Sequence, residues 1–468
     1  MSIQSAHMRT VGLIVAGSFF MQNLDSAIIN TSLPQMAVSF GVRPVDLSLG
    51  ITAYILSTAA FLPISGYLAD RLGSRTVFAA AIVLFTLASV ACGAASTLPM
   101  FALARVAQGL GAAMMSPVGR TLVLRQAQRH EIVHAMAMIT WPALIAPVLA
   151  PVLGGLITTY VSWRWNFLLN APLGLIAIAL VLAFIPKQAP QGSGPFDLKG
   201  FVLSSLALVC LLYGLERFSA GLGGWGMSVA LLGLGALASI ASVRHFRTTA
   251  HPLLQLEALS VPTFRISSIG AGLVVRAVIS ATPFLLPLLF QVGFGVSAAA
   301  AGVLIMVYFL GNLAMKTVTT ATLRRFGFRS ILAVNGALAS LAIGLCALLS
   351  SASLSVASVA ILLFAGVTRS MQFTCLNTMQ FADISRAQQA PASTLSSILQ
   401  QIATALGVGL GAILLQLIAD LRGAHGVDLP DLRLTLAIVA VAGVIAALRN
   451  LKLPRNAGEE VSGHRADN

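Results

Sequence analysis

Long apolar runs of about twenty residues divide this sequence almost from end to end, and they constrain its fold more than any other feature. A transmembrane helix needs roughly 20 consecutive apolar residues, whereas a strand of a membrane barrel is about half as long. Hydrophobic residues fill 57% of the 468 positions and charged residues only 9%, where a soluble domain carries about 25% charged residues. The chain is therefore predicted to be an all-α membrane protein. We count fourteen such runs, near residues 11–31, 47–69, 76–96, 99–121, 134–160, 165–185, 198–217, 226–244, 267–291, 298–320, 330–350, 354–378, 394–419 and 432–451.

Lysine and arginine in the short loops predict how the spans are oriented, because cytoplasmic loops carry an excess of these residues. With the N-terminus inside, nineteen Lys and Arg residues fall on the cytoplasmic side and five on the outside. Both termini are then expected in the cytoplasm, as an even number of spans requires. The predicted location is the inner (plasma) membrane of a bacterial cell, which the chain crosses many times.

The net charge of +14 raises the question of nucleic-acid binding. The positive residues are spread one to three per loop and do not gather on one face, so we expect no nucleic-acid partner. We also expect no metal and no other cofactor, because the cysteines lack the paired short spacing of a metal or disulfide framework. All four cysteines fall in apolar runs and are predicted to be small core residues: Cys92, Cys210, Cys346 and Cys375.

A coarse internal repeat predicts the domain organisation. The charged turn at 66–75 has a weaker echo at 324–329, so the first six and last six spans are interpreted as two related bundles. A segment rich in Pro, Gly and Ser at 186–195 marks the end of the first half. The predicted parts are an N-terminal six-helix bundle over 1–186, a linker and two-helix insert over 187–247, an interfacial cytoplasmic segment over 248–265, a C-terminal six-helix bundle over 266–453 and a disordered tail over 454–468.

Charged residues inside the spans are few, and each is a candidate functional residue, because a charge at the bilayer centre costs about 2.5–3.5 kcal/mol on insertion scales. Asp25 is the one acid well inside a span. A carboxylate in a partly dry site can exchange a proton near neutral pH, so Asp25 is predicted to be the proton carrier. The alternative is that Asp25 only caps or pairs with a neighbouring helix. The positive residues at comparable depth are Arg105, Arg276, Lys316 and Arg369.

Arg105 begins a second pattern, in which Arg105, Gln108 and Gly109 follow one another at helical spacing. The small residue lets a neighbouring helix approach, so that Arg105 can pair with Asp25 and take part in proton coupling. A purely structural ion pair inside the first bundle is the alternative. Gln22 lies one turn before Asp25 and makes that helix face polar.

Polar residues within the spans are candidates for lining a substrate cavity. Four deep positive residues against one deep acid suggest an electropositive cavity, which suits anions better than lipophilic cations. For each amide side chain, interhelical hydrogen bonding is the alternative. The candidate cavity residues are Gln22, Gln108, Arg276, Lys316, Arg369, Gln372, Asn377 and Gln400.

The fifth predicted span repeats small residues every four positions, which gives it one smooth face for helix packing. Its two prolines remove backbone hydrogen bonds and are expected to bend it. Such a bend could act as a pivot between bundles, and the alternative is a kinked packing helix with no gating role. The residues concerned are Pro147, Ala150, Pro151, Gly154 and Gly155.

Together these motifs resemble the major facilitator superfamily and, within it, the EmrB/QacA-like branch of drug:proton antiporters with fourteen spans; among bacterial members the chain resembles the MdtD-like group. The resemblance covers nearly the whole chain and implies the major facilitator fold, with two six-helix bundles plus two extra transmembrane helices. Ala150 departs from the pattern, which usually has glycine there, and Ser26 stands where threonine is usual. The matching motifs lie at 24–34, 66–75, 105–113, 146–155 and 163–172.

The resemblance also implies roles for the charged turn between the second and third spans. In the family this turn is a gating latch, which locks the outward-open state through charge pairs and a helix end. Arg105 would couple protonation to substrate, and the fifth helix would favour export over import. The latch residues in this sequence are Gly66, Asp70, Arg71, Gly73 and Arg75.

These observations predict a proton-coupled antiporter that exports small molecules, with multidrug efflux as the leading function, by rocking of two bundles about a central site. The sequence has no glycine-rich loop ending in Lys-Ser or Lys-Thr, so an ion gradient and not ATP is expected to drive it. One alternative is export of an anionic metabolite or a metal–citrate complex. Another is a non-transporting membrane sensor on the same fold. We expect that the protein is not an enzyme. It is predicted to be a monomer in the lipid bilayer, with protons and a small-molecule substrate as its partners.

Overall fold

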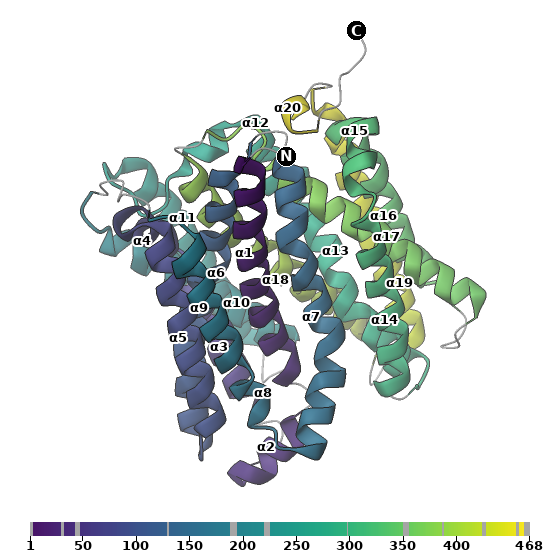
Figure 1. Ribbon diagram of the computed structural model, residues 1–468. Helices are drawn as coiled ribbons and strands as arrows, with labels where there is room; N and C mark the ends of the chain where they lie inside the picture. The colour runs from purple at the N-terminus through teal and green to yellow at the C-terminus, as the bar shows by residue number, and fades with distance from the viewer. Residues whose placement is uncertain are drawn as a thin grey trace.

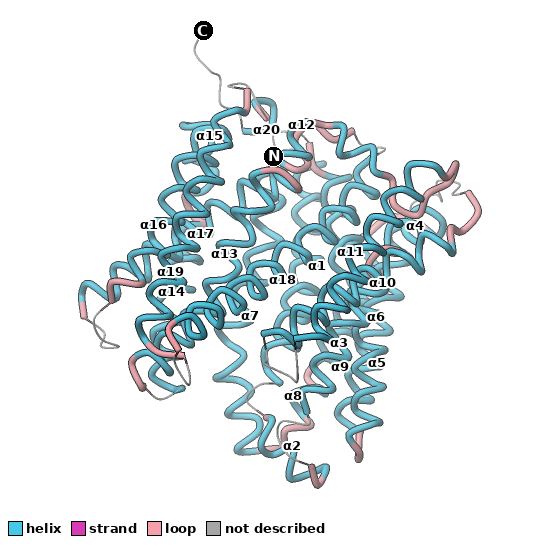
Figure 2. Tube along the Cα trace, turned by 180° about the vertical axis from the view of Figure 1, so that it is seen from behind, coloured by secondary structure: helices cyan, strands magenta, loops and turns pink. Residues whose placement is uncertain are grey.

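The computed structural model describes residues 3–29, 32–42, 47–128, 131–187, 194–219, 225–296, 298–349, 355–385, 388–423, 427–454 and 458–462. Across these ranges the regular structure is helical and no strand occurs (Figure 2). The N-terminal helices form one flank of the molecule and the C-terminal helices the other (Figure 1). The start of the first helix and the last short helix lie at the same end of the bundle, which is what an even number of spans would give.

The N-terminal half is a bundle in which α1 lies along α7, α3 along α6, and α5 between α6 and α9. Its core is made of large apolar side chains with no exposed surface, such as Phe78 and Phe85. The helices of this half are α1 (Ile3–Ile28), α2 (Leu33–Phe40), α3 (Ser48–Phe61), α4 (Ile64–Leu72), α5 (Ser74–Ala94), α6 (Leu98–Gln126), α7 (Ile132–Tyr160), α8 (Trp165–Leu168) and α9 (Asn170–Phe184).

The C-terminal half repeats the same order of pairing, because α13 lies along α18, α14 along α17, and α16 between α17 and α19. Two of its helices continue into π-helical turns, at Leu289–Gly293 and Ile331–Asn335. The helices are α12 (Pro262–Ser268), α13 (Ala271–Leu288), α14 (Ala298–Met315), α15 (Thr319–Ser330), α16 (Gly336–Cys346), α17 (Val356–Met379), α18 (Gln389–Leu421), α19 (Leu429–Leu448) and α20 (Glu459–Ser462).

The two helices between the halves, α10 (Leu198–Ser219) and α11 (Trp225–Thr248), pack on each other, and α10 also contacts α3 and α18. Asp197 ties the ends of this pair together. Its Oδ1 accepts hydrogen bonds from Gly200 N and His245 Nε2, both at 2.8 Å, and its Oδ2 accepts one from Leu253 N at 3.1 Å. Burial alone would raise the pKa of Asp197, but these three donors hold it below its ordinary value.

The described residues contain eleven helices that are long and apolar enough to cross a membrane, or twelve if the bent pair α3 and α4 forms one span. The expected count of fourteen is therefore not confirmed. Helix α7, which is 29 residues long, and the shorter apolar helix α14 lie where the fifth and tenth spans are predicted. Fourteen spans stays a prediction.

Two predicted polar segments have regular structure in their described parts. The segment expected along the membrane surface, 248–265, contains a 3-10 helix at Leu256–Ser260 and the start of α12. In the tail, which we expected to be disordered, residues 459–462 form the short helix α20, which contacts α15. The side chain of Val461 is only 2% exposed, so this part of the tail packs against the protein.

Glycines let the helices that carry the candidate site approach closely. A Cβ at Gly109 in α6 would lie 2.6 Å from the carbonyl oxygen of Tyr54 in α3, closer than real Cβ atoms come. In the other half, a Cβ at Gly366 in α17 would lie even closer to the carbonyl oxygen of Tyr308 in α14. Both halves thus use a glycine against a tyrosine carbonyl to bring corresponding helix pairs together.

Candidate functional site

A buried ion pair joins α1 to α6 inside the N-terminal half. Arg105 Nη1 donates to Asp25 Oδ2 at 2.8 Å, and neither side chain is more than 1% exposed. The structure thus brings together the two residues that the sequence analysis paired. Removing one partner of a buried ion pair strongly destabilises a protein, because the other charge is left uncompensated.

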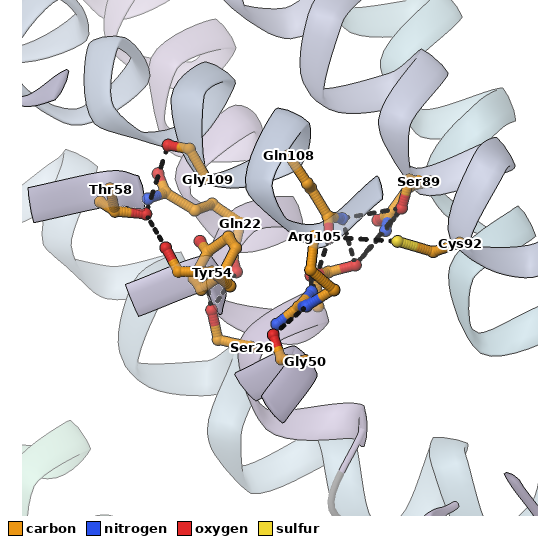
Figure 3. Close-up of polar contacts among 12 residues, drawn as sticks. Gln22, Ser26, Gly50, Tyr54, Thr58, Ser89, Cys92, Arg105, Gln108 and Gly109 are labelled. Carbon is orange, nitrogen blue, oxygen red and sulfur yellow. Dashed lines mark hydrogen bonds and ion pairs between the residues drawn. The ribbon is translucent and has the colours of Figure 1, made fainter. Parts of the chain in front are cut away.

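Arg105 has acceptors besides Asp25. Its Nη1 also lies 2.6 Å from Gln108 Oε1, and its Nε lies 3.4 Å from the carbonyl oxygen of Gly50 (Figure 3). Its guanidinium carbon lies 4.3 Å from the ring centroid of Tyr54, which is a cation–π distance. The positive charge is therefore held by more than the carboxylate.

Two polar residues that the sequence analysis did not select, Ser89 in α5 and Asn170 in α9, also reach Asp25. Its Oδ1 accepts from Gln108 Nε2 at 2.8 Å, Asn170 Nδ2 at 2.7 Å and Ser89 Oγ at 3.3 Å. Asn170 lies within the family motif at 163–172, so the sequence did contain a pattern that could have selected it. Ser89 lies in an apolar run with no distinguishing spacing.

Gln22, one turn before Asp25, makes hydrogen bonds to α6. Its Nε2 lies 3.5 Å from the carbonyl oxygen of Ala112, and its Oε1 accepts from Ser116 Oγ at 3.2 Å. Gln22 is only partly buried, which leaves it available as a polar lining residue.

The C-terminal half contains the other deep positive residues. Arg276 Nη1 donates to Asn377 Oδ1 at 2.7 Å. The ring of Phe373 is near two guanidinium groups. Its centroid lies 5.4 Å from the guanidinium carbon of Arg276 and 5.2 Å from that of Arg369. These four residues form what we call the arginine cluster.

Several buried donor atoms of the arginine cluster make no hydrogen bond to another described residue. Arg276 Nη2, Arg369 Nε and Arg369 Nη1 are buried and make no hydrogen bond within the described structure. Lys316 is 6% exposed and donates to the hydroxyl of Thr374, one residue beyond the cluster's phenylalanine. Buried donors without partners are rare in proteins, because each loses its hydrogen bonds to water.

The two predicted glutamines of this half make hydrogen bonds between or within helices. Gln372 has no exposed surface, donates to the carbonyl oxygen of Leu332 at 3.1 Å and accepts from Asn335 at 3.0 Å. It thus fits the alternative of interhelical hydrogen bonding. Gln400 donates to Ser396 at 2.9 Å and is partly buried, so it can still face a cavity.

Helices α4 and α6 of the N-terminal half meet α18 of the C-terminal half near the end of the bundle where α1 begins (Figure 1). Hydrogen bonds between described residues cross this boundary in the first turns of α18. They join Ser393 Oγ to the Pro117 carbonyl oxygen at 2.9 Å, Arg120 Nη1 to Ser396 Oγ at 3.2 Å, and Ser65 Oγ to Thr394 Oγ1 at 3.2 Å.

The family model described as the Major Facilitator Superfamily matches residues 15–408, and again 271–466. The chain belongs to the major facilitator superfamily. This family of membrane transporters accounts for the helical halves and the many apolar helices.

Bacterial members of the superfamily align with most of the chain. A protein of Cronobacter sakazakii named "Putative multidrug resistance protein MdtD" is 36% identical over 428 residues, which are 88% of this chain and 89% of that protein. A protein of the same name from Pectobacterium atrosepticum is 35% identical over 449 residues, covering 94% of this chain and 96% of that protein. The predicted resemblance to the MdtD-like group is thus confirmed.

Solved structures of the superfamily share the fold. The proton:xylose symporter XylE superposes with a TM-score of 0.66 over 97% of this chain and 98% of its own, at 15% identity. The human organic anion transporter MFSD10 gives 0.63 over 96% and 99%, also at 15% identity. The predicted major facilitator fold is confirmed by these two neighbours.

The latch residues of this major facilitator chain do not pair with one another. Asp70 lies 3.4 Å from Arg125 at the end of α6, a partner that the sequence analysis did not predict. Arg71 bonds to the hydroxyl of Tyr67, and Arg75 donates to the carbonyl oxygen of Leu182 at 2.7 Å. The charged turn is thus tied to its own half by three separate contacts.

The two latch glycines lie at points where the backbone is crowded or turns. Gly66 is buried in α4, and Gly73 separates α4 from α5 with φ at 84°, a value that residues with a Cβ rarely adopt. A cavity of about 320 Å³ beside this turn is lined by Gly66, Asp70 and Thr394, among other residues. The turn therefore lies where both halves of the superfamily fold meet.

The segment with small residues every four positions, 147–155, lies in α7, which packs along α1. Ala150 has no exposed surface and joins a small core cluster with Leu24 and Ile28 of α1. Gly154 is buried, and Pro147 is partly buried. The side chain of Pro151 and the burial of Gly155 lie outside what the structure describes. Small residues thus face the helix that carries Asp25.

Proposed function

We propose that this protein is a proton-coupled antiporter that exports small molecules across the bacterial inner membrane, with both termini in the cytoplasm. The observation that carries the proposal is the buried ion pair of Asp25 and Arg105 between α1 and α6. The names of the bacterial relatives support multidrug efflux as the first candidate for its task. No catalytic role is proposed for the chain.

The pair can couple a proton to a conformational change because protonation removes one of its two charges. With Asp25 neutral, the attraction that holds α1 against α6 weakens. In the present conformation the carboxylate is sealed, at 1% exposure, so a second conformation must open it to water. In the proposed orientation, the hydrogen bonds to α18 lie at the cytoplasmic end, and release of these bonds would open the site inward.

The direct test is transport by the purified protein in liposomes with an imposed pH difference. We expect accumulation of a lipophilic cation such as ethidium against its gradient, and loss of this accumulation when an uncoupler is added. Flux that ignores the pH difference would contradict proton coupling. Absence of any flux for every probe would favour the non-transporting sensor.

Export of an anion is a second candidate, because the arginine cluster favours it. Arg276 and Arg369 together present three buried donor atoms that make no hydrogen bond to any residue that the structure describes. A carboxylate could accept from such donors in a planar, paired geometry that an amine or a lipophilic cation cannot match. The candidate substrates of this kind are an anionic metabolite and a metal–citrate complex.

Neutralising the arginine cluster separates the two candidates. We expect Arg276→Gln with Arg369→Gln to lower transport of citrate about 10- to 100-fold, because hydrogen bonds to charged groups contribute about 1.5–3 kcal/mol. Transport of ethidium should change little. The matched control is Arg433→Gln in the same half, where the guanidinium donates to the Leu349 carbonyl oxygen at 2.8 Å. Citrate transport that survives in the double variant would exclude the arginine cluster as an anion site.

A further inference from the structure

The two oxygens of the Asp25 carboxylate lie in different surroundings. Among the described residues, Oδ2 accepts one hydrogen bond, from Arg105. Oδ1 accepts three, from Gln108, Asn170 and Ser89. These donors come from α6, α9 and α5, so the three-donor oxygen is held by helices on several sides of α1.

Ser89 fixes how these donors are arranged. Its Oγ accepts from Asn170 Nδ2 at 2.7 Å and from Gln108 Nε2 at 3.0 Å. A hydroxyl has two acceptor positions and one proton. Because both acceptor positions are used, the single proton of Ser89 is left to point at Asp25 Oδ1, 3.3 Å away. Each amide group in turn uses both of its hydrogens, one on Asp25 and one on Ser89.

The position of Asn170 follows from the local sequence. Asn170 is the first residue of α9, directly after the break that ends α8 at Leu168. Pro172 lies in the first turn of α9, where a helix has no need of its backbone N–H. The helix can therefore start at Asn170 and direct this side chain into the bundle, where it is 1% exposed.

We propose that Asn170 and Ser89 are positioning residues, which hold Asp25 Oδ1 so that the transported proton adds to Oδ2. The proposal deepens the proposed antiport and rests on it for its biological meaning. An oxygen that already accepts three hydrogen bonds cannot bind a proton unless a donor leaves. Oδ2 has only to release Arg105.

The step conserves charge and protons. H⁺ from water forms the O–H bond on Oδ2, the carboxylate becomes neutral, and the N–H···Oδ2 bond of Arg105 breaks. Arg105 keeps its proton and its charge, with Gln108 Oε1 at 2.6 Å and the Gly50 carbonyl oxygen at 3.4 Å as remaining acceptors. On release, the O–H bond breaks, H⁺ leaves to water on the other side, and Arg105 bonds to Oδ2 again.

Other titratable groups near Asp25 are few. Arg105 faces it from α6, and Tyr54 and Cys92 interact with it from α3 and α5. Helices α8 and α9 contain no titratable residue. In α7 the titratable residues are near the two ends: His134 is exposed, and Tyr160 is 80% exposed. A change in the proton uptake of Asp25 can thus be traced to the donors on Oδ1.

The test measures protonation of Asp25 directly in the purified full-length protein. Difference infrared spectroscopy follows the carbonyl band of a protonated carboxyl during a pH titration, and Asp25→Asn assigns the band. Loss of a donor favours the protonated form, so we expect Asn170→Ala to move the midpoint of the titration upward by roughly one to two pH units. Ser89→Ala should move it in the same direction. The pH dependence of export in liposomes should shift in parallel.

Asn166→Ala is the matched control, because Asn166 is a buried asparagine four residues from Asn170 that bonds instead to Ser32 at 2.6 Å and Thr158 at 2.8 Å. Its midpoint should equal that of the unaltered protein. An unshifted midpoint in Asn170→Ala and Ser89→Ala would overturn the proposal, as would absence of any Asp25 band. A shifted midpoint in a protein whose flux ignores a pH gradient would instead refute the antiport and leave the positioning roles in place.

Discussion

Asp25→Asn is expected to abolish accumulation of substrate against its gradient. Asparagine has nearly the same size and can keep hydrogen bonds at this site, but it cannot carry the proton that links the pH gradient to transport. One pH unit is worth about 1.4 kcal/mol per proton, or tenfold accumulation per exchanged proton. In liposomes with a pH difference, the unaltered protein should approach this ratio, and the variant should stop at equal concentrations on both sides.

Exchange of labelled for unlabelled substrate without any gradient controls for a folding defect. The Asp25→Asn variant should still carry out this exchange, because its two halves and its arginine cluster are intact. Arg105 would lose its carboxylate in the variant, and breaking a buried pair can cost about 3–5 kcal/mol. The remaining bonds of Arg105 to Gln108 and Gly50 should reduce that loss. Thermal unfolding in detergent should therefore show a lower midpoint but a folded protein. Gradient-driven accumulation that persists in Asp25→Asn would remove Asp25 from the proton pathway.

The fold could be predicted from the sequence because lipid leaves few choices to an apolar chain. Runs of about twenty apolar residues must be helices, and family motifs then specify the arrangement. A break within the second span was not predicted from the sequence. The second predicted span, 47–69, is divided in the structure into α3 and α4, which meet at an angle of 58°. Pro63 lies at the break. A proline has no backbone N–H and its ring clashes with the carbonyl four residues earlier.

The candidate site was only partly predictable, because pairing depends on distances across the bundle. Asp25 and Arg105 are rare charges in apolar spans, so each stood out by itself, and opposite charges suggested the pair. Ser89 did not stand out, because a lone serine in an apolar helix usually bonds to its own backbone. The partner of Asp70 was missed for a similar reason: Arg125 is 55 residues away in the sequence, and several nearer arginines were equally plausible from spacing.

A second large effect is expected at Gly366, where α17 crosses α14. A Cβ at this position would lie well under 3.0 Å from the carbonyl oxygen of Tyr308 and 2.8 Å from the backbone N of Asn312. The contact is reciprocal, since a Cβ at Gly311 would meet the carbonyl oxygen of Leu363. Backbone atoms of two packed helices cannot move aside as a flexible side chain can. Even Gly366→Ala must therefore push the helices apart.

We expect Gly366→Ala to destabilise the protein by about 3 kcal/mol, the upper part of the range for an overpacked core. The matched control is Gly302→Ala in α14, where a Cβ meets nothing within 4 Å. That change removes a flexible residue from a helix and should stabilise it by about 0.5–1 kcal/mol. Thermal unfolding in detergent should thus shift in opposite directions for the two variants. Equal midpoints would show that α14 and α17 can separate without loss.

The Gly366 contact also positions the arginine cluster. The ring of Tyr308 lies 5.6 Å from the guanidinium of Arg369, and the carbonyl oxygen of the same tyrosine is the atom that a new Cβ would displace. Moving α14 away from α17 should therefore shift Tyr308 relative to Arg369. If the arginine cluster binds an anion, any folded Gly366→Ala protein should transport citrate more weakly than the Gly302→Ala control, while its exchange of ethidium changes less. Citrate transport equal to that of the control, measured on protein that remains folded, would show that the helix crossing contributes stability alone.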